Sequence, residues 1–260
     1  MHRYNDRTVI ITGAGSGLGR AAAVRLAAEG AVLSLVDRSE EGLVRTREAV
    51  ETASPGTRIV STTADVSRQP DVARYVESTL EAFSRVDGFF NNAGIEGTQN
   101  LTEDYTEEEF QRVLDVNLTG VFLGLEAVLP VMRKQGGGYV VNSASVGGIR
   151  GIGRQSGYAA AKHGVVGLTR NSAVEYGQWG VRVNAIAPGA TWTPMVEASM
   201  RQLDPEDPRA AAVQFAQGNP AGRFGEPEEV AAVVAFLLSE DASYVNAAVI
   251  PIDGGQSAKY

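Results

Sequence analysis

Two side chains four residues apart, Tyr158 and Lys162, could carry out proton chemistry together. On a helix they would lie on one face, one turn apart, so the lysine ammonium would stabilise the tyrosine anion. An ordinary phenol has a pKa of about 10, and a neighbouring cation lowers that pKa. Such a tyrosine would protonate a carbonyl oxygen as hydride is added, and would accept the proton in the reverse reaction. Taken alone, the same spacing most often marks a solvated surface pair.

Ser145 precedes this pair and follows the apolar run Tyr139–Val141. Ligand-binding side chains gather at the ends of strands in open α/β sheets. We therefore expect the Ser145 hydroxyl to hold the substrate oxygen.

Glycines alternate through residues 12–19, directly after the first apolar run. In such a turn the backbone can approach a pyrophosphate, and the following helix offers its free N–H groups. Many strand-to-helix turns are glycine-rich for steric reasons alone, so this run by itself is weak evidence.

Asp37 lies twenty residues beyond Gly17, at the end of the second apolar run. There a carboxylate would bind a ribose diol and repel a 2′-phosphate. An N-cap or turn aspartate is the structural alternative, and the neighbouring Arg38 is a conflicting sign because arginine binds phosphate. Since Ser16 in the glycine loop is uncharged, the sequence favours NAD.

Short apolar runs alternate with amphipathic segments along the chain. The runs cover residues 9–11, 32–36, 59–60, 86–90, 139–141, 181–186 and 249–252, and the helical segments cover 19–29, 40–51, 71–83, 107–132, 157–176 and 227–238. Strands that are apolar throughout indicate a parallel sheet covered on both faces. We predict an α/β single-domain Rossmann fold over residues 1–260, a doubly wound parallel sheet of about seven strands with helices on both faces.

Residues 189–225 break this rhythm with four prolines. We expect this segment to be a mobile excursion, because long excursions of this kind often close over a site as a lid.

Composition excludes several classes of function. The 260 residues include no cysteine and two histidines, which argues against disulfides, thiolate catalysis and a His or Cys metal site. A net charge of −8 argues against nucleic acid and anionic membrane as partners. No run of eighteen apolar residues occurs, and the first strand begins too early for a signal peptide, so we expect a cytoplasmic protein.

Together these residues resemble the short-chain dehydrogenase/reductase family from Arg7 to Gly255. The matching motifs, which are very specific in combination, are Thr12-Gly13-x-x-x-Gly17-x-Gly19, Asp65-Val66, Asn91-Asn92-Ala93-Gly94, Asn117, Ser145, Tyr158-x-x-x-Lys162, Pro188-Gly189 with Thr193, and Asp253-Gly254-Gly255. Residues 245–247, Val-Asn-Ala, depart from the family's usual pattern before the last strand.

The resemblance implies hydride transfer between NAD(H) and a secondary alcohol or ketone. Tyr158 would be the acid and base, Ser145 the substrate-orienting group, Lys162 the tuning cation and ribose ligand, and Asn117 the anchor of a water-mediated proton path. The implied cofactor-binding residues are Gly13, Ser16, Gly17, Leu18, Gly19, Asp37, Arg38, Asp65, Val66, Asn92, Ala93, Gly94, Tyr158, Lys162, Pro188, Gly189, Thr191 and Thr193.

We expect an uncharged, compact substrate, most simply a cyclic ketone or diketone. This expectation rests on the resemblance and on the charges near the site. The implied substrate-binding residues are Ser145, Ile95, Val146, Ile152, Trp192 and Met195. Glu96 would repel an anion, whereas Arg150 and Arg154 could point either way.

Other functions remain open at this point: a reductase of 3-oxoacyl or steroid type, or a non-catalytic NAD sensor. An epimerase or dehydratase would need a larger C-terminal domain. The resemblance also implies a homotetramer, with which the apolar stripes of the segments 107–132 and 157–176 agree.

Overall fold

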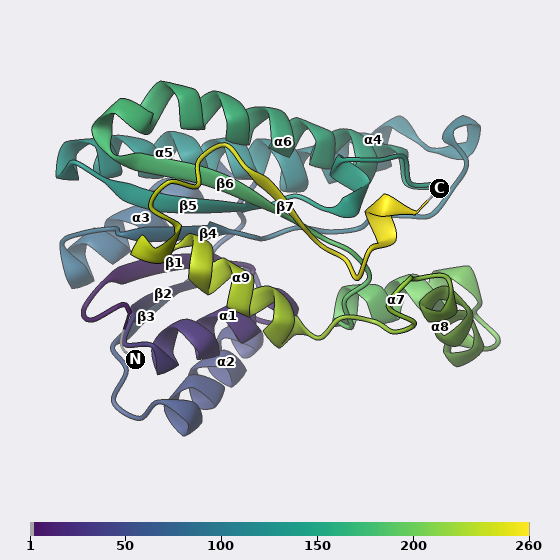
Figure 1. Cartoon of the computed structure of the whole chain (residues 1–260), viewed down its shortest axis with the longest axis horizontal. Coiled ribbons are helices and arrows are strands. Elements are labelled where there is room, and N and C mark those ends of the chain that lie inside the picture. The colour runs from purple at the N-terminus through teal and green to yellow at the C-terminus, as the bar shows by residue number, and fades with distance from the viewer. Residues whose placement is uncertain (1–2, 260) are drawn as a thin grey trace.

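The computed structural model describes residues 3–259, in which seven strands form one parallel sheet (Figure 1). The strands are β1 (Thr8–Thr12), β2 (Val32–Asp37), β3 (Ile59–Thr63), β4 (Gly88–Asn91), β5 (Gly138–Ser143), β6 (Val181–Pro188) and β7 (Val249–Ile252), in the order β3-β2-β1-β4-β5-β6-β7. The predicted fold class is confirmed.

Buried side chains lie on both faces of the sheet. In β1, Val9 and Ile11 belong to one apolar core and Ile10 to the other, because successive side chains of a strand point to opposite faces. This two-sided burial explains why the strand sequences are apolar throughout rather than alternating.

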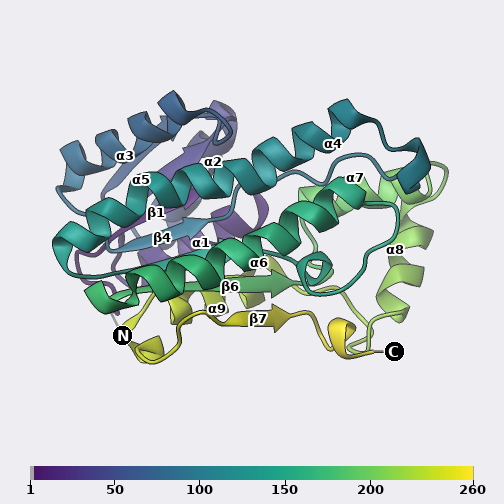
Figure 2. The ribbon, with the colours of Figure 1, turned by 90° about the horizontal axis from the view of Figure 1, so that it is seen from above.

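Helices cover both faces (Figure 2). One face carries α1 (Gly17–Ala28), α2 (Glu40–Ala53) and α9 (Pro227–Leu237), and the other carries α3 (Gln69–Phe83), α5 (Gly120–Gln135) and α6 (Ser156–Tyr176). The two cores are thereby closed by one helical layer each.

The helix predicted over 107–132 is interrupted. It consists of α4 (Glu107–Leu114), a π-helical turn η2 (Asp115–Thr119) and α5. Residues Glu107–Gln135 together are long and apolar enough to cross a membrane by length and composition alone. Their apolar side chains, such as Val121, Leu125 and Val128, instead pack in the core beneath the sheet.

The excursion at 189–225 contains two helices that the sequence did not predict, α7 (Pro194–Leu203) and α8 (Pro208–Gln217). Two of the four prolines that suggested irregular structure, Pro194 and Pro208, occupy the first turn of these helices, where proline's missing N–H does no harm. Pro205 and Pro220 lie outside both helices. The side chains of Thr193 and Asp207 cap these helices by accepting from Val196 N and Ala210 N. Figure 1 shows both helices beyond one end of the sheet.

Candidate active site

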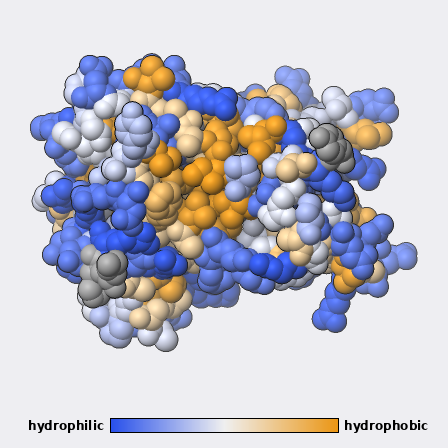
Figure 3. Space-filling model, in the orientation of Figure 1, coloured by the Kyte–Doolittle hydropathy of each residue, from blue (hydrophilic) through white to orange (hydrophobic). Residues whose placement is uncertain are grey.

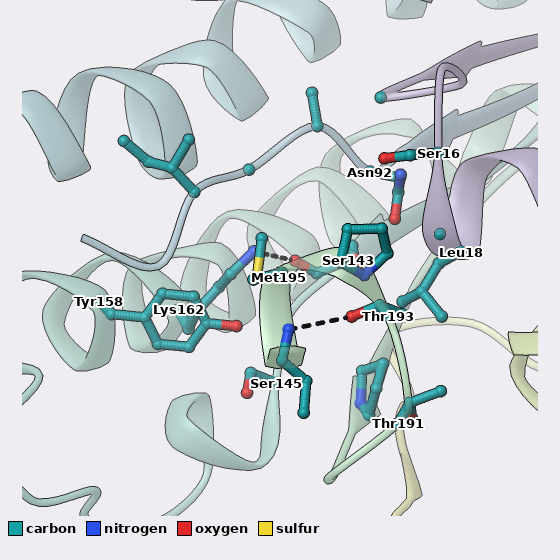
Figure 4. A pocket seen from close by; sticks show the side chains of 18 of the residues that line it. Ser16, Leu18, Asn92, Ser143, Ser145, Tyr158, Lys162, Thr191, Thr193 and Met195 are labelled. Carbon is teal, nitrogen blue, oxygen red and sulfur yellow. Dashed lines mark hydrogen bonds between the residues drawn. The ribbon is translucent and has the colours of Figure 1, made fainter. Parts of the chain in front are cut away.

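A cleft of about 300 Å³ opens beyond the carboxyl ends of the central strands. Strand order reverses between β1 and β4, the place where ligands bind in open α/β sheets. The cleft is lined by Gly13, Ser16, Gly17, Leu18, Asp37, Arg38, Asn92, Ala93, Gly94, Ile95, Ser143, Ala144, Ser145, Tyr158, Lys162, Pro188, Gly189, Thr191, Thr193, Pro194, Met195 and Val196 (Figure 4).

The glycine loop leaves an anion-binding helix end open to ligand. Gly13 and Gly17 have φ of 66° and 48°, which favours glycine at both positions. Ser16 precedes α1 without capping it through its side chain, so the first N–H groups of the helix remain available for a phosphate. Gly19 does not line the cleft: a Cβ there would lie 2.1 Å from the Gly13 carbonyl oxygen, so this glycine permits the loop to pack on the helix.

Asp37 is held rigidly at the end of β2. Its Oδ2 accepts from Gly15 N at 2.8 Å and its Oδ1 from Ser39 N at 2.8 Å. Asp37 and Arg38 also line an adjoining pocket of about 100 Å³, together with Asp65 and Val66. The residues assigned to the adenosine half of a dinucleotide therefore lie together, with a carboxylate among them.

Ser145, Tyr158 and Lys162 lie side by side in the cleft (Figure 4). Ser145 lies two residues beyond the end of β5 and precedes the short helix η3 (Val146–Gly148), whereas Tyr158 and Lys162 project from the first turns of α6. Lys162 Nζ donates to the Ser143 carbonyl oxygen at 2.7 Å and lies 5.5 Å from the centre of the Tyr158 ring. A proton donor, an oxygen-binding hydroxyl and a cation thus converge on one point.

The pKa of Tyr158 lies above its ordinary value, opposite to the direction expected from the Tyr-Lys spacing. Burial raises the pKa of the Tyr158 hydroxyl, and the Ser145 hydroxyl partly offsets this by lowering it. Burial also lowers the pKa of Lys162 to about 8. Withdrawal from water therefore dominates the pKa of each group, and Tyr158 remains a protonated donor at neutral pH.

Asn117 faces inward from the π-helical turn and is fully buried. Its Oδ1 accepts from Ile95 N at 2.8 Å and its Nδ2 donates to Ile95 O at 2.7 Å. A Cβ on Gly94 would lie 2.8 Å from Asn117 Oδ1 and 3.6 Å from Lys162 Nζ. The Asn117 side chain therefore fixes the backbone beside the lysine.

The predicted substrate-binding residues divide into two groups. Ile95, Ser145 and Met195 line the cleft, but Val146, Ile152 and Trp192 do not. Val146 is buried inside η3, the Ile152 side chain lies against Gly147, and the Trp192 ring packs edge-on against Phe224 at 5.1 Å. Four lining residues were missed: Ser143, Ala144, Pro194 and Val196. Their positions beside Ser145 and Thr193 in the sequence could have indicated them.

Comparison with known proteins gives consistent matches along the whole chain. A family model described as enoyl-(acyl carrier protein) reductase matches residues 13–257. Levodione reductase from Leifsonia aquatica is 69% identical, covering 99% of this chain and 97% of that protein. A crystal structure of levodione reductase has a TM-score of 0.99 at 69% identity, covering 99% of this chain and 100% of the other.

More distant relatives share the same architecture. Cyclohexanol dehydrogenase from Acinetobacter sp. (strain SE19) is 38% identical, covering 99% of this chain and 98% of that protein. The crystal structure of NAD⁺-bound xylitol dehydrogenase has a TM-score of 0.93 at 34% identity, covering 97% and 100% of the two chains.

Proposed function

Since this chain belongs to the short-chain dehydrogenase/reductase family and is an alcohol/ketone oxidoreductase, we propose that it reduces an uncharged cyclic ketone or diketone, such as levodione, with NADH and reversibly. The observation that carries the proposal is the convergence of Ser145, Tyr158 and Lys162 in one cleft, in a chain 69% identical to levodione reductase.

A bound nicotinamide cofactor supplies the hydride. The chain's own residues then perform the rest: Ser145 donates a hydrogen bond to the substrate oxygen, and Tyr158 gives that oxygen its proton. Lys162 keeps positive charge beside the phenolate that results. Thr191, Thr193, Pro188 and Gly189 would hold the carboxamide end of the cofactor, and the open N-terminus of α1 its phosphates.

NAD rather than NADP is the proposed cofactor. A 2′-phosphate on the adenosine ribose would approach the fixed Asp37 carboxylate, and like charges in a partly buried site repel strongly. Arg38 is the only cation that lines the same pocket in the described part of the chain, so it tempers the preference without reversing it.

The distribution of cationic side chains around the cleft supports an uncharged substrate. Among residues 3–259, Arg38 and Lys162 are the only cations that line the cleft, and both are proposed to bind the cofactor. Arg150, one of the two other arginines considered for binding an anion, donates instead to the Gln256 carbonyl oxygen. A carboxylate or phosphate substrate would therefore lack the paired donor that such groups usually meet.

Turnover with a ketone panel tests the proposal. Nicotinamide absorbance would be followed with substituted cyclohexanones and cyclohexanediones, against 3-oxoacids, acyl thioesters and steroid ketones. We expect the highest kcat/KM for the cyclic uncharged compounds. Preference for charged substrates would overturn the substrate class, and NADH binding without turnover of any ketone would favour a sensor.

We further propose a cytoplasmic homotetramer. In the isolated chain, Phe122 of α5 and Val174 of α6 are 47% and 81% exposed. A second apolar surface lies over the edge strand β7, seen as the orange patch in Figure 3. Two such faces on one chain suit the two kinds of twofold interface of a symmetric tetramer.

A further inference from the structure

Glu96 receives hydrogen bonds from two distant segments of the chain and from Gln99 in its own loop. Its Oε1 accepts from Ser199 Oγ at 2.8 Å, from Gln99 Nε2 at 3.3 Å and from Gln155 Nε2. Its Oε2 is buried without a hydrogen-bond partner. A half-buried carboxylate whose Oε2 lacks a partner is destabilising in itself, so the three hydrogen bonds to Oε1 must compensate.

Two of these partners belong to parts of the active site. Gln155 is the residue immediately before α6, three positions from Tyr158, and its carbonyl accepts from Ala159 N at 2.9 Å. Ser199 lies in the middle of α7, the helix that begins beside the cleft residues Thr193 and Met195. Glu96 therefore connects α7 directly to the start of the catalytic helix.

Polar contacts reinforce the connection. Gln99 Nε2 donates to Ser199 Oγ at 2.6 Å, Gln99 N donates to Gln202 Oε1 at 3.1 Å, and Gln202 Nε2 donates to the Gly97 carbonyl at 3.3 Å. Of the ten residues of α7, Ser199 and Met200 alone are buried. This helix is thus attached to residues 96–99 by hydrogen bonds that water can replace, which suits a reversible closure better than apolar packing would.

We propose that Glu96 is a positioning residue that latches α7 closed over the cleft and aligns the start of α6 in the same step. Opening the cleft breaks the bonds from Glu96 and Gln99 to Ser199. Closing it remakes them and holds Met195 and Thr193 against the bound substrate and cofactor. The expected effect of the latch on ketone reduction rests on the proposed function. The latch itself can be observed by proteolysis, without turnover.

The test compares Glu96→Gln, Ser199→Ala and the double variant with the whole wild-type protein. The matched control is Glu197→Gln, an exposed carboxylate on α7 that pairs only with Arg201 of the same helix. Two measurements are made on each: the rate of limited proteolysis within 194–217 in the presence of NADH, and the steady-state kinetics of ketone reduction.

We expect each single variant to speed proteolysis of the lid and to raise KM for ketone about tenfold, with kcat changed much less, since a hydrogen bond to a buried charge is worth about that factor. The double variant should add little to either single one, because Glu96→Gln removes the charge of the acceptor and Ser199→Ala removes the donor of the same hydrogen bond. Glu197→Gln should behave as wild type.

Lid proteolysis at wild-type rate in both Glu96→Gln and Ser199→Ala would overturn the latch, as would fully additive effects in the double variant. If the wild-type protein reduced none of the ketones, that result would instead contradict the proposed function. In that case the proteolysis results would still decide whether the latch exists.

Discussion

Tyr158 is the residue on which the proposed chemistry depends. Phenylalanine in its place removes the transferable proton and leaves the packing of the ring, so Tyr158→Phe should lower kcat for ketone reduction by about 10²–10⁴-fold. NADH affinity, measured by fluorescence titration, should be unchanged. Tyr176→Phe, at the far end of α6, is the control and should keep full activity. Retention of most activity by Tyr158→Phe would remove the role assigned to the phenol.

Lys162 gives the site a pH dependence, because burial lowers its pKa to about 8. Below that pH the side chain is an ammonium ion, and above it the positive charge beside Tyr158 is lost. We therefore expect kcat/KM for reduction to be constant at neutral pH and to fall above an apparent pKa near 8 that belongs to the Tyr158 and Lys162 pair. A profile that stays flat to pH 10 would contradict this.

The free energy of unfolding should rise with pH over the range in which kcat/KM falls. In the unfolded chain Lys162 titrates near its ordinary pKa of 10.5, so between about pH 8 and 10.5 the unfolded state binds more protons and stability rises with pH. Relative to Lys162→Met, the wild-type protein should be less stable below pH 8, with the difference shrinking towards pH 10.5. Urea unfolding at several pH values measures it, and separates loss of activity from loss of fold.

Asp37 should decide between the two dinucleotides. In Asp37→Ala the repulsion of a 2′-phosphate disappears and so do the bonds to Gly15 N and Ser39 N, so NADP should bind more tightly and NAD more weakly. We expect the ratio of kcat/KM values for NAD over NADP to fall at least tenfold, on the order of one close charge pair in a partly buried site. Glu40→Gln, a nearby surface change, is the control. Equal kcat/KM for both cofactors in the wild-type protein would refute the preference.

At the level of elements, the π-helical turn decides where Asn117 points. Asn117→Ala would leave the Ile95 N–H and carbonyl without partners in a buried site, at a cost of about 1–3 kcal/mol for each group. We expect a clear drop in unfolding free energy together with weaker NADH binding. The exposed Asn100→Ala should change stability by less than about 0.5 kcal/mol. Equal stability of the two variants would show that the Asn117 clamp is unimportant.

Elements with strong local signals were predictable from the sequence. The helix expected over 227–238 begins at the predicted residue and ends one residue earlier than expected. Its start was predictable because Pro227 and the capping box of Glu226 and Glu229 mark it. The helices α7 and α8 carried comparable signals in Thr193 and Asp207, but the prolines were interpreted as breaks.

Contacts between distant segments were not predictable in this way. Nothing local distinguishes the π-helical turn from the α-helix around it, because its register depends on packing. Likewise, Gln155 and Ser199 meet at Glu96 only through tertiary structure. The residues proposed to be catalytic were identifiable because their spacing reflects one helix and one strand end, whereas the lining of the cleft by Met195 and its neighbours depends on how residues 189–225 fold back.

At the scale of the whole molecule, the edge strand β7 and the face of α5 and α6 bear on the proposed assembly. A sheet edge such as β7 is a liability when exposed, because its unpaired backbone groups can pair with other chains. Burial against a second copy would cover both this edge and the apolar side chains beside it. The α5 and α6 face would then form the second, independent interface.

Phe122→Glu tests that second interface. Each twofold contact would bring two copies of the introduced carboxylate into an apolar surface, and such like-charge placement costs several kcal/mol. We expect wild-type protein to show four times the chain mass of 27.4 kDa by light scattering at micromolar concentration, and Phe122→Glu to show twice that mass, because the β7 interface remains. Val44→Glu is the matched control: Val44 is 49% exposed, close to the 47% of Phe122, but lies on α2, away from both faces. It should remain tetrameric. A monomeric wild-type protein would refute the tetramer, and a tetrameric Phe122→Glu would place the interface elsewhere on the surface.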